Sequence, residues 1–308
     1  MNNQKTNKFD VVGFGALNMD QLHYVDKLAG ADEESFITGV SESCGGSAAN
    51  TTIGLSRMGL KTGFLGKVSG DREGNTLLNN LIQEKVNTDG VTVSSSGRSG
   101  RVMGFVDKQG QRSLYVDPGV NDLILMEDID LSYLNHTQFL HLTSFVGDSF
   151  KAQEELISEI RDKIKISFDP GRIYVEKGFE SLERILNRTD ILLINEVELE
   201  LLLKNRYESY IQGAKLLLKE GIGLVVVKRG SQGSYAVNDE FEVSMPCLDV
   251  KCVDTTGAGD AFNAGLLYSL IQNYSLKEGC EFANYVASKC IECYGATDGL
   301  PYTSNTSE

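Results

Sequence analysis

The chain has 308 residues, of which 41% are hydrophobic and 23% charged, which is the composition of a globular protein and excludes a disordered one. Its 29 Lys and Arg against 43 Asp and Glu give a formal net charge of −14, which disfavours nucleic acid as a partner but leaves room for a small anion at a local backbone site. The polar N-terminus and the absence of any run of about 18 apolar residues favour a cytoplasmic protein with no membrane partner.

The first half of the chain predicts buried strands, short alternating strands and two helices. A buried strand over 9–15 is followed by alternating polar pieces within 17–43, where no helix pattern occurs. A second group of short strands, within 97–117, contains a hairpin with its turn at 108–111. We expect the two groups to form a small second sheet. The other elements expected here are a helix from 47 to 59, a strand over 62–68 and a helix over 75–84.

From about residue 136 the chain alternates between strand and helix patterns. This alternation predicts a parallel sheet with helices on both of its faces. The expected strands lie at 139–142, 164–168, 191–194 and 224–227, and the clearest helices at 150–163 and 207–220. We therefore expect the whole chain, residues 1–308, to be one α/β domain, with strands from about 17–43 and 97–117 inserted in it.

Among 32 glycines, those in the segment 254–260 (DTTGAGD) are the most informative. Gly257, Ala258 and Gly259 put exposed amides at the start of a helix, and these amides and the helix dipole together form an anion site. A carboxylate at Asp260 would repel an anion bound there, but it is well placed as a base that takes a hydroxyl proton. The alternative is a carboxylate that caps a core helix.

A second glycine-rich segment, Gly45-Gly46-Ser47-Ala48-Ala49-Asn50, precedes the first expected helix. Glycines there let a ligand approach the backbone, and the donor and acceptor of the Asn50 amide suit a polyol. A tight, closely packed turn is the alternative. Asp20 follows the first strand, where ligand sites of α/β proteins lie, and its carboxylate could pair with two sugar hydroxyls. Taken alone, Asp20 is better explained as a turn residue.

Other nucleotide and metal motifs are incomplete. Gly13 and Gly15 begin a dinucleotide fingerprint, but Asn18 occupies the third glycine position, which disfavours an NAD-dependent oxidoreductase. Cys290 and Cys293 form a CxxC without a second pair, so buried helix thiols are favoured over a metal or redox site. The sequence contains neither a complete Walker A loop nor the HRD and DFG motifs of protein kinases.

The segments 45–74 and 254–267 resemble the two signatures of the PfkB carbohydrate kinase family, and the segment order matches over nearly the whole chain. Within that family, the sequence most resembles archaeal-type sugar and nucleoside kinases. The resemblance implies a ribokinase-like three-layer α/β/α sandwich with a mostly parallel central sheet and a small β-sheet lid. It also implies transfer of the γ-phosphate of ATP to a hydroxyl of a sugar or nucleoside.

The resemblance assigns roles to particular residues. Gly257, Ala258 and Gly259 form the anion hole, and Asp260 is the catalytic base. The substrate-binding residues are Asp20, Gly45, Gly46 and Asn50. The nucleotide-binding residues are Asn195, Lys228, Gly230, Ser231, Gly233 and Asn284, and Gly230, Ser231 and Gly233 belong to the GSxG turn of the family. From the residues alone, Lys228 could reach a phosphate or be surface charge. Glu198 is expected to bind Mg²⁺ through water, and Asp254 and Thr256 lie where many members hold a monovalent cation such as K⁺. From the residues alone, an acidic helix face is the better interpretation of Glu198.

The acceptor is less defined than the donor. A ribose-like sugar or a ribonucleoside is favoured, and Arg98, Arg101 and Arg112 would indicate a sugar phosphate if they pointed into the site. Alternatively, the three arginines are solvated charges at the edge of the lid. A nucleotide- or sugar-binding regulator without catalysis is a further hypothesis, which the intact Asp260 disfavours. We also expect a homodimer through the lid, because a small sheet with one face toward the ligand leaves the other face to cover.

Overall fold

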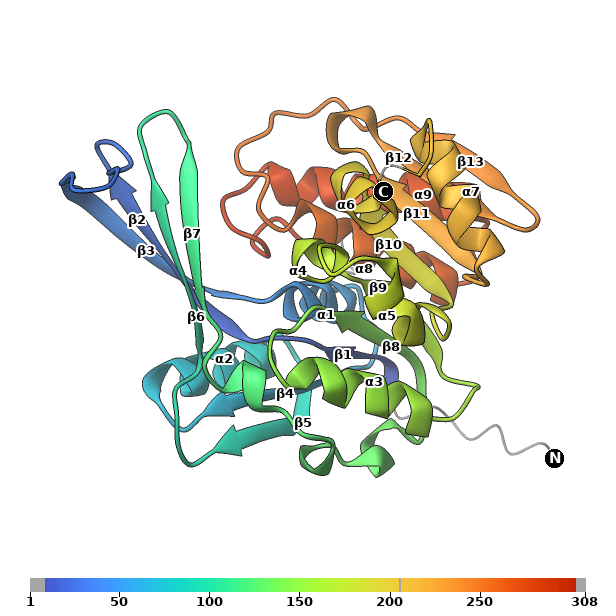
Figure 1. Ribbon diagram of the computed structural model, residues 1–308, viewed down its shortest axis with the longest axis horizontal. Coiled ribbons are helices and arrows are strands. Elements are labelled where there is room, and N and C mark those ends of the chain that lie inside the picture. Colours follow the sequence, from blue (N-terminus) through green and yellow to red (C-terminus); the bar gives the residue numbers. More distant parts are fainter. Residues whose placement is uncertain (1–8, 205, 303–308) are drawn as a thin grey trace.

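A computed structural model describes residues 9–204 and 206–302, which form two β-sheets and the helices around them (Figure 1). The larger sheet has nine strands in the order β13-β12-β11-β10-β9-β8-β1-β4-β5. Seven of its strands are parallel, and β12 and β13 add an antiparallel edge. The strand bounds are β1 Phe9–Phe14, β4 Thr62–Ser69, β5 Asn87–Ser94, β8 Thr137–Thr143, β9 Lys165–Asp169, β10 Ile191–Asn195, β11 Leu224–Lys228, β12 Ser234–Asn238 and β13 Glu242–Met245.

Both faces of the large sheet are buried, which explains the continuous apolar runs of its strands. Because side chains alternate along a strand, Leu192 and Ile194 pack into one core while Leu193 packs into the other. Helices α3 to α7 cover the first core: α3 Ser149–Glu159, α4 Gly171–Val175, α5 Phe179–Leu186, α6 Glu196–Leu203 and α7 Tyr210–Lys219. The second core lies under α1 Ser47–Arg57, α2 Arg72–Gln83, α8 Ala258–Ile271 and α9 Leu276–Ile291. The predicted α/β/α layering is confirmed.

The smaller sheet, which we call the lid, stands out from one side of the body (Figure 1). Its strand order is β3-β2-β6-β7, and β2 pairs with β6 in parallel while the outer pairs are antiparallel. The bounds are β2 Asn18–Val25, β3 Ile37–Gly45, β6 Gly100–Val106 and β7 Arg112–Asp117. These strands come from the two segments in which the sequence predicts them, so the second sheet is confirmed.

Several element bounds differ from the sequence-based expectation. The helix expected over 150–163 ends at Glu159, because the chain turns there so that Ile160 and Ile164 both enter the core. The helix expected from 75 begins at Arg72, since the Asp71 side chain accepts a hydrogen bond from the Gly74 amide and caps it. Strands β5, β12 and β13 lie in segments for which no strand is expected from the sequence. None of the helices in the described ranges is long and apolar enough to cross a membrane.

Candidate active site

The predicted catalytic and nucleotide residues converge at the carboxyl ends of the parallel strands. Asp169, Asn195 and Lys228 are the last residues of β9, β10 and β11, and Asn195 lies beside Lys228 in the sheet register. Ligands of open α/β sheets bind at this edge. Helix α8 begins beside the same edge, so its first turn and the strand ends face a common space.

The first turn of α8 has the backbone geometry of an anion site. Gly257 caps the helix with φ of 75°, and a Cβ there would come within 2.6 Å of Ala296. Only glycine meets both conditions without strain. The amides of the first helical turn have no partners within a helix, and the dipole makes this end positive. The expected hole at Gly257, Ala258 and Gly259 therefore has a structural basis.

Asp260 lies in this turn and is in contact with the second glycine-rich segment. The amide nitrogen Nδ2 of Asn50 donates to Oδ2 of Asp260 over 2.8 Å, and the hydroxyl of Thr51 donates to the Asp260 carbonyl oxygen. Burial and, to a lesser extent, the charge on Asp169 raise the pKa of Asp260, the Asn50 hydrogen bond lowers it, and the resulting pKa is about 7. The carboxyl group therefore titrates near neutral pH, which suits a general base.

Asp20 lies against the backbone of Gly45 at the base of the lid. A Cβ on residue 45 would come within 2.2 Å of the Asp20 carboxylate, so the glycine makes room for this side chain. Burial raises the pKa of Asp20 to about 7. Gly46 has φ of 122° and approaches the Ala16 carbonyl oxygen too closely for a side chain. The structure thus brings Asp20, Gly45, Gly46 and Asn50 together.

A small pocket lies between the lid and the body. It has a volume of about 160 Å³, and Val102 and Val116 line it from the lid face that also carries Asp20. Asn121, which sequence reasoning missed, lines it as well and donates to the Asn18 side chain and to the Leu17 carbonyl oxygen. None of the side chains recorded as lining this pocket carries a charge.

The three lid arginines do not line that pocket. Arg98 makes a two-bond ion pair with Asp117, and its side chain is 62% exposed. Arg101 lies in β6 on the opposite lid face from Val102 and pairs with Glu73 over 3.1 Å. Arg98 and Arg101 therefore already have acidic partners, which favours their interpretation as a charged lid edge. Arg112 lies instead on the Asp20 face of the lid, and its charge contributes to the lowered pKa of Asp254.

A larger cavity of about 580 Å³ adjoins the anion site. This size falls within the range of small-molecule sites. Predicted nucleotide residues line it: Lys228, Gly230, Ser231, Gly233 and Asn284. The Asn284 amide donates to the Pro246 carbonyl oxygen and so pins the segment 246–252, which forms one wall. The exposed Cys247 and Cys252, which the sequence reasoning did not select, belong to that wall.

The glycines of the GSxG turn are required by geometry. Gly230 and Gly233 have φ of 55° and 86°, and a Cβ on Gly233 would lie 1.9 Å from the Met245 carbonyl oxygen. The thiol of Cys247 donates to the carbonyl oxygen of Ser231, which ties the turn to the 246–252 segment. This turn therefore offers its backbone directly to the cavity.

The side chain of Lys228 is only 13% exposed, which disfavours its interpretation as surface charge, and it is paired. Its ammonium nitrogen lies 2.7 Å from Oδ2 of Asp169 and 3.3 Å from Oδ1 of Asn263. The Asn263 amide donates to the same Asp169 oxygen over 2.7 Å. Burial tends to raise the pKa of Asp169, but Lys228 outweighs it and holds this pKa below its usual range. Sequence reasoning missed Asp169 and Asn263, although Asp169 ends a parallel strand and Asn263 follows the DTTGAGD segment.

Asn195 and Glu198 form a capping box at the start of α6. The Asn195 side chain accepts from the Glu198 amide, and the Glu198 carboxylate accepts from the Asn195 amide, each over 2.9 Å. Glu198 is partly buried, unlike the exposed Glu200, so a simple solvated face does not describe it. Burial and the nearby charge of Asp169 raise the pKa of Glu198.

Asp254 and Thr256 close the loop before the anion site. One Asp254 oxygen accepts from the amide and the hydroxyl of Thr256, and the other accepts from the Gly295 amide. Burial tends to raise the pKa of Asp254, but these hydrogen bonds lower it. Both carboxylate oxygens therefore already have donors. Within residues 9–204 and 206–302, no group of three or more His, Cys, Asp and Glu side chains has a metal-binding arrangement.

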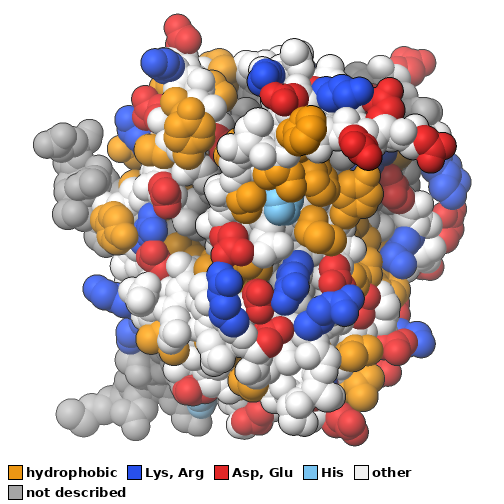
Figure 2. Space-filling view, turned by 90° about the vertical axis from the view of Figure 1, so that its left-hand side faces the viewer, with side chains coloured by type: hydrophobic (Ala, Val, Ile, Leu, Met, Phe, Trp, Pro, Cys, Tyr) orange, Lys and Arg blue, Asp and Glu red, His pale blue; other side chains and the backbone are white. Residues whose placement is uncertain are grey.

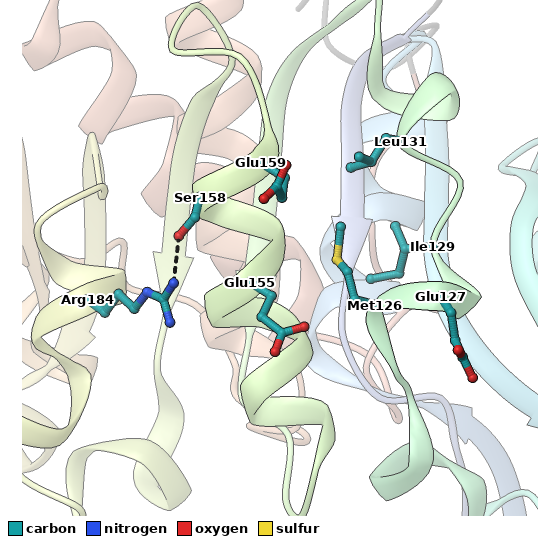
Figure 3. A pocket seen from close by; sticks show the side chains of 8 residues that line it. All are labelled: Met126, Glu127, Ile129, Leu131, Glu155, Ser158, Glu159 and Arg184. Carbon is teal, nitrogen blue, oxygen red and sulfur yellow. Dashed lines mark hydrogen bonds between the residues drawn. The ribbon is translucent and has the colours of Figure 1, made fainter.

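Two other features stand apart from this chemistry. A surface groove between α3, α5 and the segment 126–131 has three glutamates and one arginine in its lining (Figure 3). Its acidic lining disfavours phosphate. Cys290 is buried in α9 and Cys293 is partly buried, and all six cysteines are free thiols. The favoured interpretation of the CxxC as buried helix thiols holds for Cys290, whereas Cys293 lies after the end of α9 and is only partly buried.

Comparisons with known proteins agree with this geometry. The family described as pfkB family carbohydrate kinase matches residues 8–303. An uncharacterized sugar kinase of Archaeoglobus fulgidus is 43% identical over 253 residues, which are 81% of this chain and 98% of that protein. An ATP-dependent ribose-1-phosphate kinase of Halopiger xanaduensis is 32% identical and covers 89% of both chains. The structure of a Thermotoga maritima ribokinase superposes with a TM-score of 0.87 at 26% identity, covering 96% of this chain and 97% of that one.

Proposed function

The chain belongs to the pfkB family of carbohydrate kinases, with a ribokinase-like fold, and we propose that it moves the γ-phosphate of ATP to a hydroxyl of a ribose-like sugar or a ribonucleoside. The observation that carries this proposal is the hydrogen bond from Asn50 to Asp260. It joins the expected acceptor side of the site to the expected phosphate side, so a hydroxyl beside Asn50 also lies beside the base.

In the proposed mechanism Asp260 accepts the proton of the acceptor hydroxyl. A pKa near 7 keeps a large fraction of this carboxyl ionised at neutral pH, while its proton affinity stays high enough to take up a proton. The amides of Gly257, Ala258 and Gly259 stabilise the charge on the moving phosphoryl group. Closure of the lid over the pocket would exclude water, which otherwise competes as an acceptor.

The proposed acceptor side combines a carboxylate with neutral polar and apolar groups. Within residues 9–204 and 206–302 the Asp20 carboxylate has no hydrogen-bond partner, and it can accept from two neighbouring hydroxyls. Val102 and Val116 offer an apolar surface to a sugar ring or a base. The uncharged pocket lining favours an unphosphorylated acceptor. The 32% identical ribose-1-phosphate kinase favours a sugar phosphate, which we keep as the second candidate.

We propose Mg²⁺ as the metal partner of the nucleotide. Asp169, Glu198 and Asp260 surround the one ammonium group of Lys228, and this excess of negative charge fits a divalent cation. Glu198, with Asn195, would hold the ion through water, since Mg²⁺ keeps part of its water shell. When bound, it would neutralise charge on the triphosphate. K⁺ near Asp254 and Thr256 stays a proposal, and both oxygens of Asp254 already accept hydrogen bonds.

We further propose that the chain is one kinase domain with an inserted lid, and that two copies pair through the outer lid face. His23 stacks on Phe105, which also contacts Tyr115, and all three side chains lie opposite the Asp20 face. Val40 and Tyr115 are 56% and 59% exposed. Figure 2 shows hydrophobic side chains gathered on one face above a row of mixed charges. Light scattering should give a dimer mass, and a monomer at micromolar concentration would refute this pairing.

The proposed reaction is tested by an acceptor panel. ADP release is measured with ribose, ribose 1-phosphate, fructose 6-phosphate, adenosine, inosine and cytidine, and each product is identified by mass spectrometry. A phosphorylated ribose or nucleoside supports the main proposal, and turnover with ribose 1-phosphate alone supports the second candidate. Tight ATP binding without turnover of any acceptor would favour a regulator. Because ATP is an intracellular metabolite, the proposed reaction would take place in the cytoplasm.

A further inference from the structure

A buried cation lies directly behind the proposed anion site. The side chains of Lys228 and Asp169 are only 13% and 10% exposed, and their charged atoms are 2.7 Å apart. Asn263 contacts both partners, because its amide nitrogen donates to Asp169 and its oxygen accepts from Lys228. This three-residue group, which we call the lysine clamp, joins the end of β9, the end of β11 and the second turn of α8.

The lysine clamp opens toward the nucleotide cavity. Lys228 lines that cavity together with Gly230 and Gly259. A Cβ built on Gly259 would lie 3.5 Å from the ammonium nitrogen, so no side chain separates the ammonium from the amides of the hole. An ammonium group has three donors, and in the part of the chain that the structure describes its hydrogen bonds to Asp169 and Asn263 use two of them. One donor is left for a group bound in the cavity.

We infer that Lys228 binds a phosphate of the nucleotide and that Asp169 and Asn263 are positioning residues which hold its ammonium group at the anion site. This inference rests on the proposed kinase function. A lysine is a point charge on a flexible four-carbon stem, so its use at a fixed location requires something to hold it. Asp169 supplies an opposite charge, and Asn263 limits the orientation of both groups.

If the Lys228–Asp169 ion pair were purely structural, different experimental results would be expected. It would hold β9 against α8, and its loss would lower stability and disturb the whole cavity. Binding of adenosine and of ATP would then weaken together. A phosphate-binding lysine affects ATP alone, because adenosine has no phosphate. The ratio of the two affinities therefore separates the two roles.

The first test is Lys228→Met, which keeps the length of the side chain and removes its charge. Binding of ATP is measured by calorimetry without acceptor, and binding of adenosine is measured by its competition with ATP, which counts only adenosine in the nucleotide cavity. We expect ATP to bind about 10- to 100-fold more weakly, the equivalent of one charge-assisted hydrogen bond. Adenosine should bind within about twofold of the wild type, since one lost phosphate contact is the only difference.

The second test asks whether Asp169 acts through Lys228. Asp169→Asn should weaken ATP binding, and Lys228→Met/Asp169→Asn should bind ATP no more weakly than Lys228→Met alone. The double variant removes both charges of the Lys228–Asp169 pair, so neither is left without its partner, and it keeps the test valid if Lys228→Met alone fails to fold. The matched control is Lys67→Met/Asp128→Asn, which removes a pair of similar exposure and a 2.8 Å separation away from the cavity. This control should leave the ATP affinity unchanged.

Two results would overturn the phosphate-binding role of Lys228. One is a Lys228→Met or double variant that binds ATP as tightly as the wild type. The other is an equal loss of ATP and adenosine affinity, which would make the lysine clamp structural. Additive losses in the double variant would refute the positioning role of Asp169. A wild-type protein that binds no ATP at all would instead refute the proposed function, so the two failures are distinguishable.

Discussion

Replacing Asp260 by Asn removes the proposed base and keeps the shape of the side chain. The new amide oxygen can still accept the hydrogen bond that Asn50 donates to Asp260. We therefore expect a folded variant whose kcat is lower by about 10²- to 10⁴-fold, which is the usual contribution of a general base. ATP binding should change little, because the amides of Gly257 and Gly259 are untouched.

The same substitution should change stability in a direction set by the pKa of Asp260. Burial raises this pKa from 3.8 to about 7, so between these pH values the folded state binds more protons than the unfolded state. Stability contributed by this group is therefore present at low pH and is lost as the pH rises through 7. A shift of this size corresponds to about 4 kcal/mol above pH 7, and Asp260→Asn removes that cost.

The assay follows from these two expectations. The kcat of wild type and Asp260→Asn is compared with the best acceptor, and both are unfolded in urea at pH 4 and pH 8. We expect the variant to be nearly inactive, more stable than the wild type at pH 8, and closer to it at pH 4. Near-wild-type kcat would refute the base assignment. Lower stability at pH 8 would refute the raised pKa of Asp260.

Three further predictions concern the same site. The wild-type kcat should fall about tenfold per unit as the pH drops below about 7, because Asp260 becomes protonated; a flat profile between pH 5 and 8 would contradict this. Asn50→Leu should move that acid limb to higher pH, since Asn50 lowers the pKa of Asp260, and an unmoved limb would show that the contact is absent in solution. Gly257→Ala should cost about 1–2 kcal/mol of stability from its φ of 75° alone, measured by urea unfolding, and should weaken ATP binding; a neutral effect would refute the required glycine.

The layers of the fold follow from the sequence. Alternation of apolar strands and helices after residue 136 predicts a parallel sheet covered on both faces, because such strands bury side chains on both sides. The short alternating strands before residue 120 predict the second sheet. Strand β5 lacks this apolar pattern, since its segment NTDGVTVS is polar at several positions. The strand lies at the edge of the sheet. Long-range pairing with β4 decides its structure.

Part of the site could be predicted in the same way. Gly257, Gly259 and Asp260 are contiguous, so their spacing alone indicates an anion site with a base. The lysine clamp could not be predicted, because Asp169, Lys228 and Asn263 are separated by 59 and 35 residues and meet only through the sheet and α8. The local sequence left open whether Lys228 was surface charge or a phosphate contact.

The sequence by itself determined which glycines matter at the site, because a positive φ or a close backbone approach requires glycine at one particular position. Only the tertiary structure decided which charges face one another. Asn50 and Asp260 are 210 residues apart, and their contact lowers the pKa of the base against the larger effect of burial. Electrostatic interactions depend on distance and burial, and neither can be read from the order of residues along the chain.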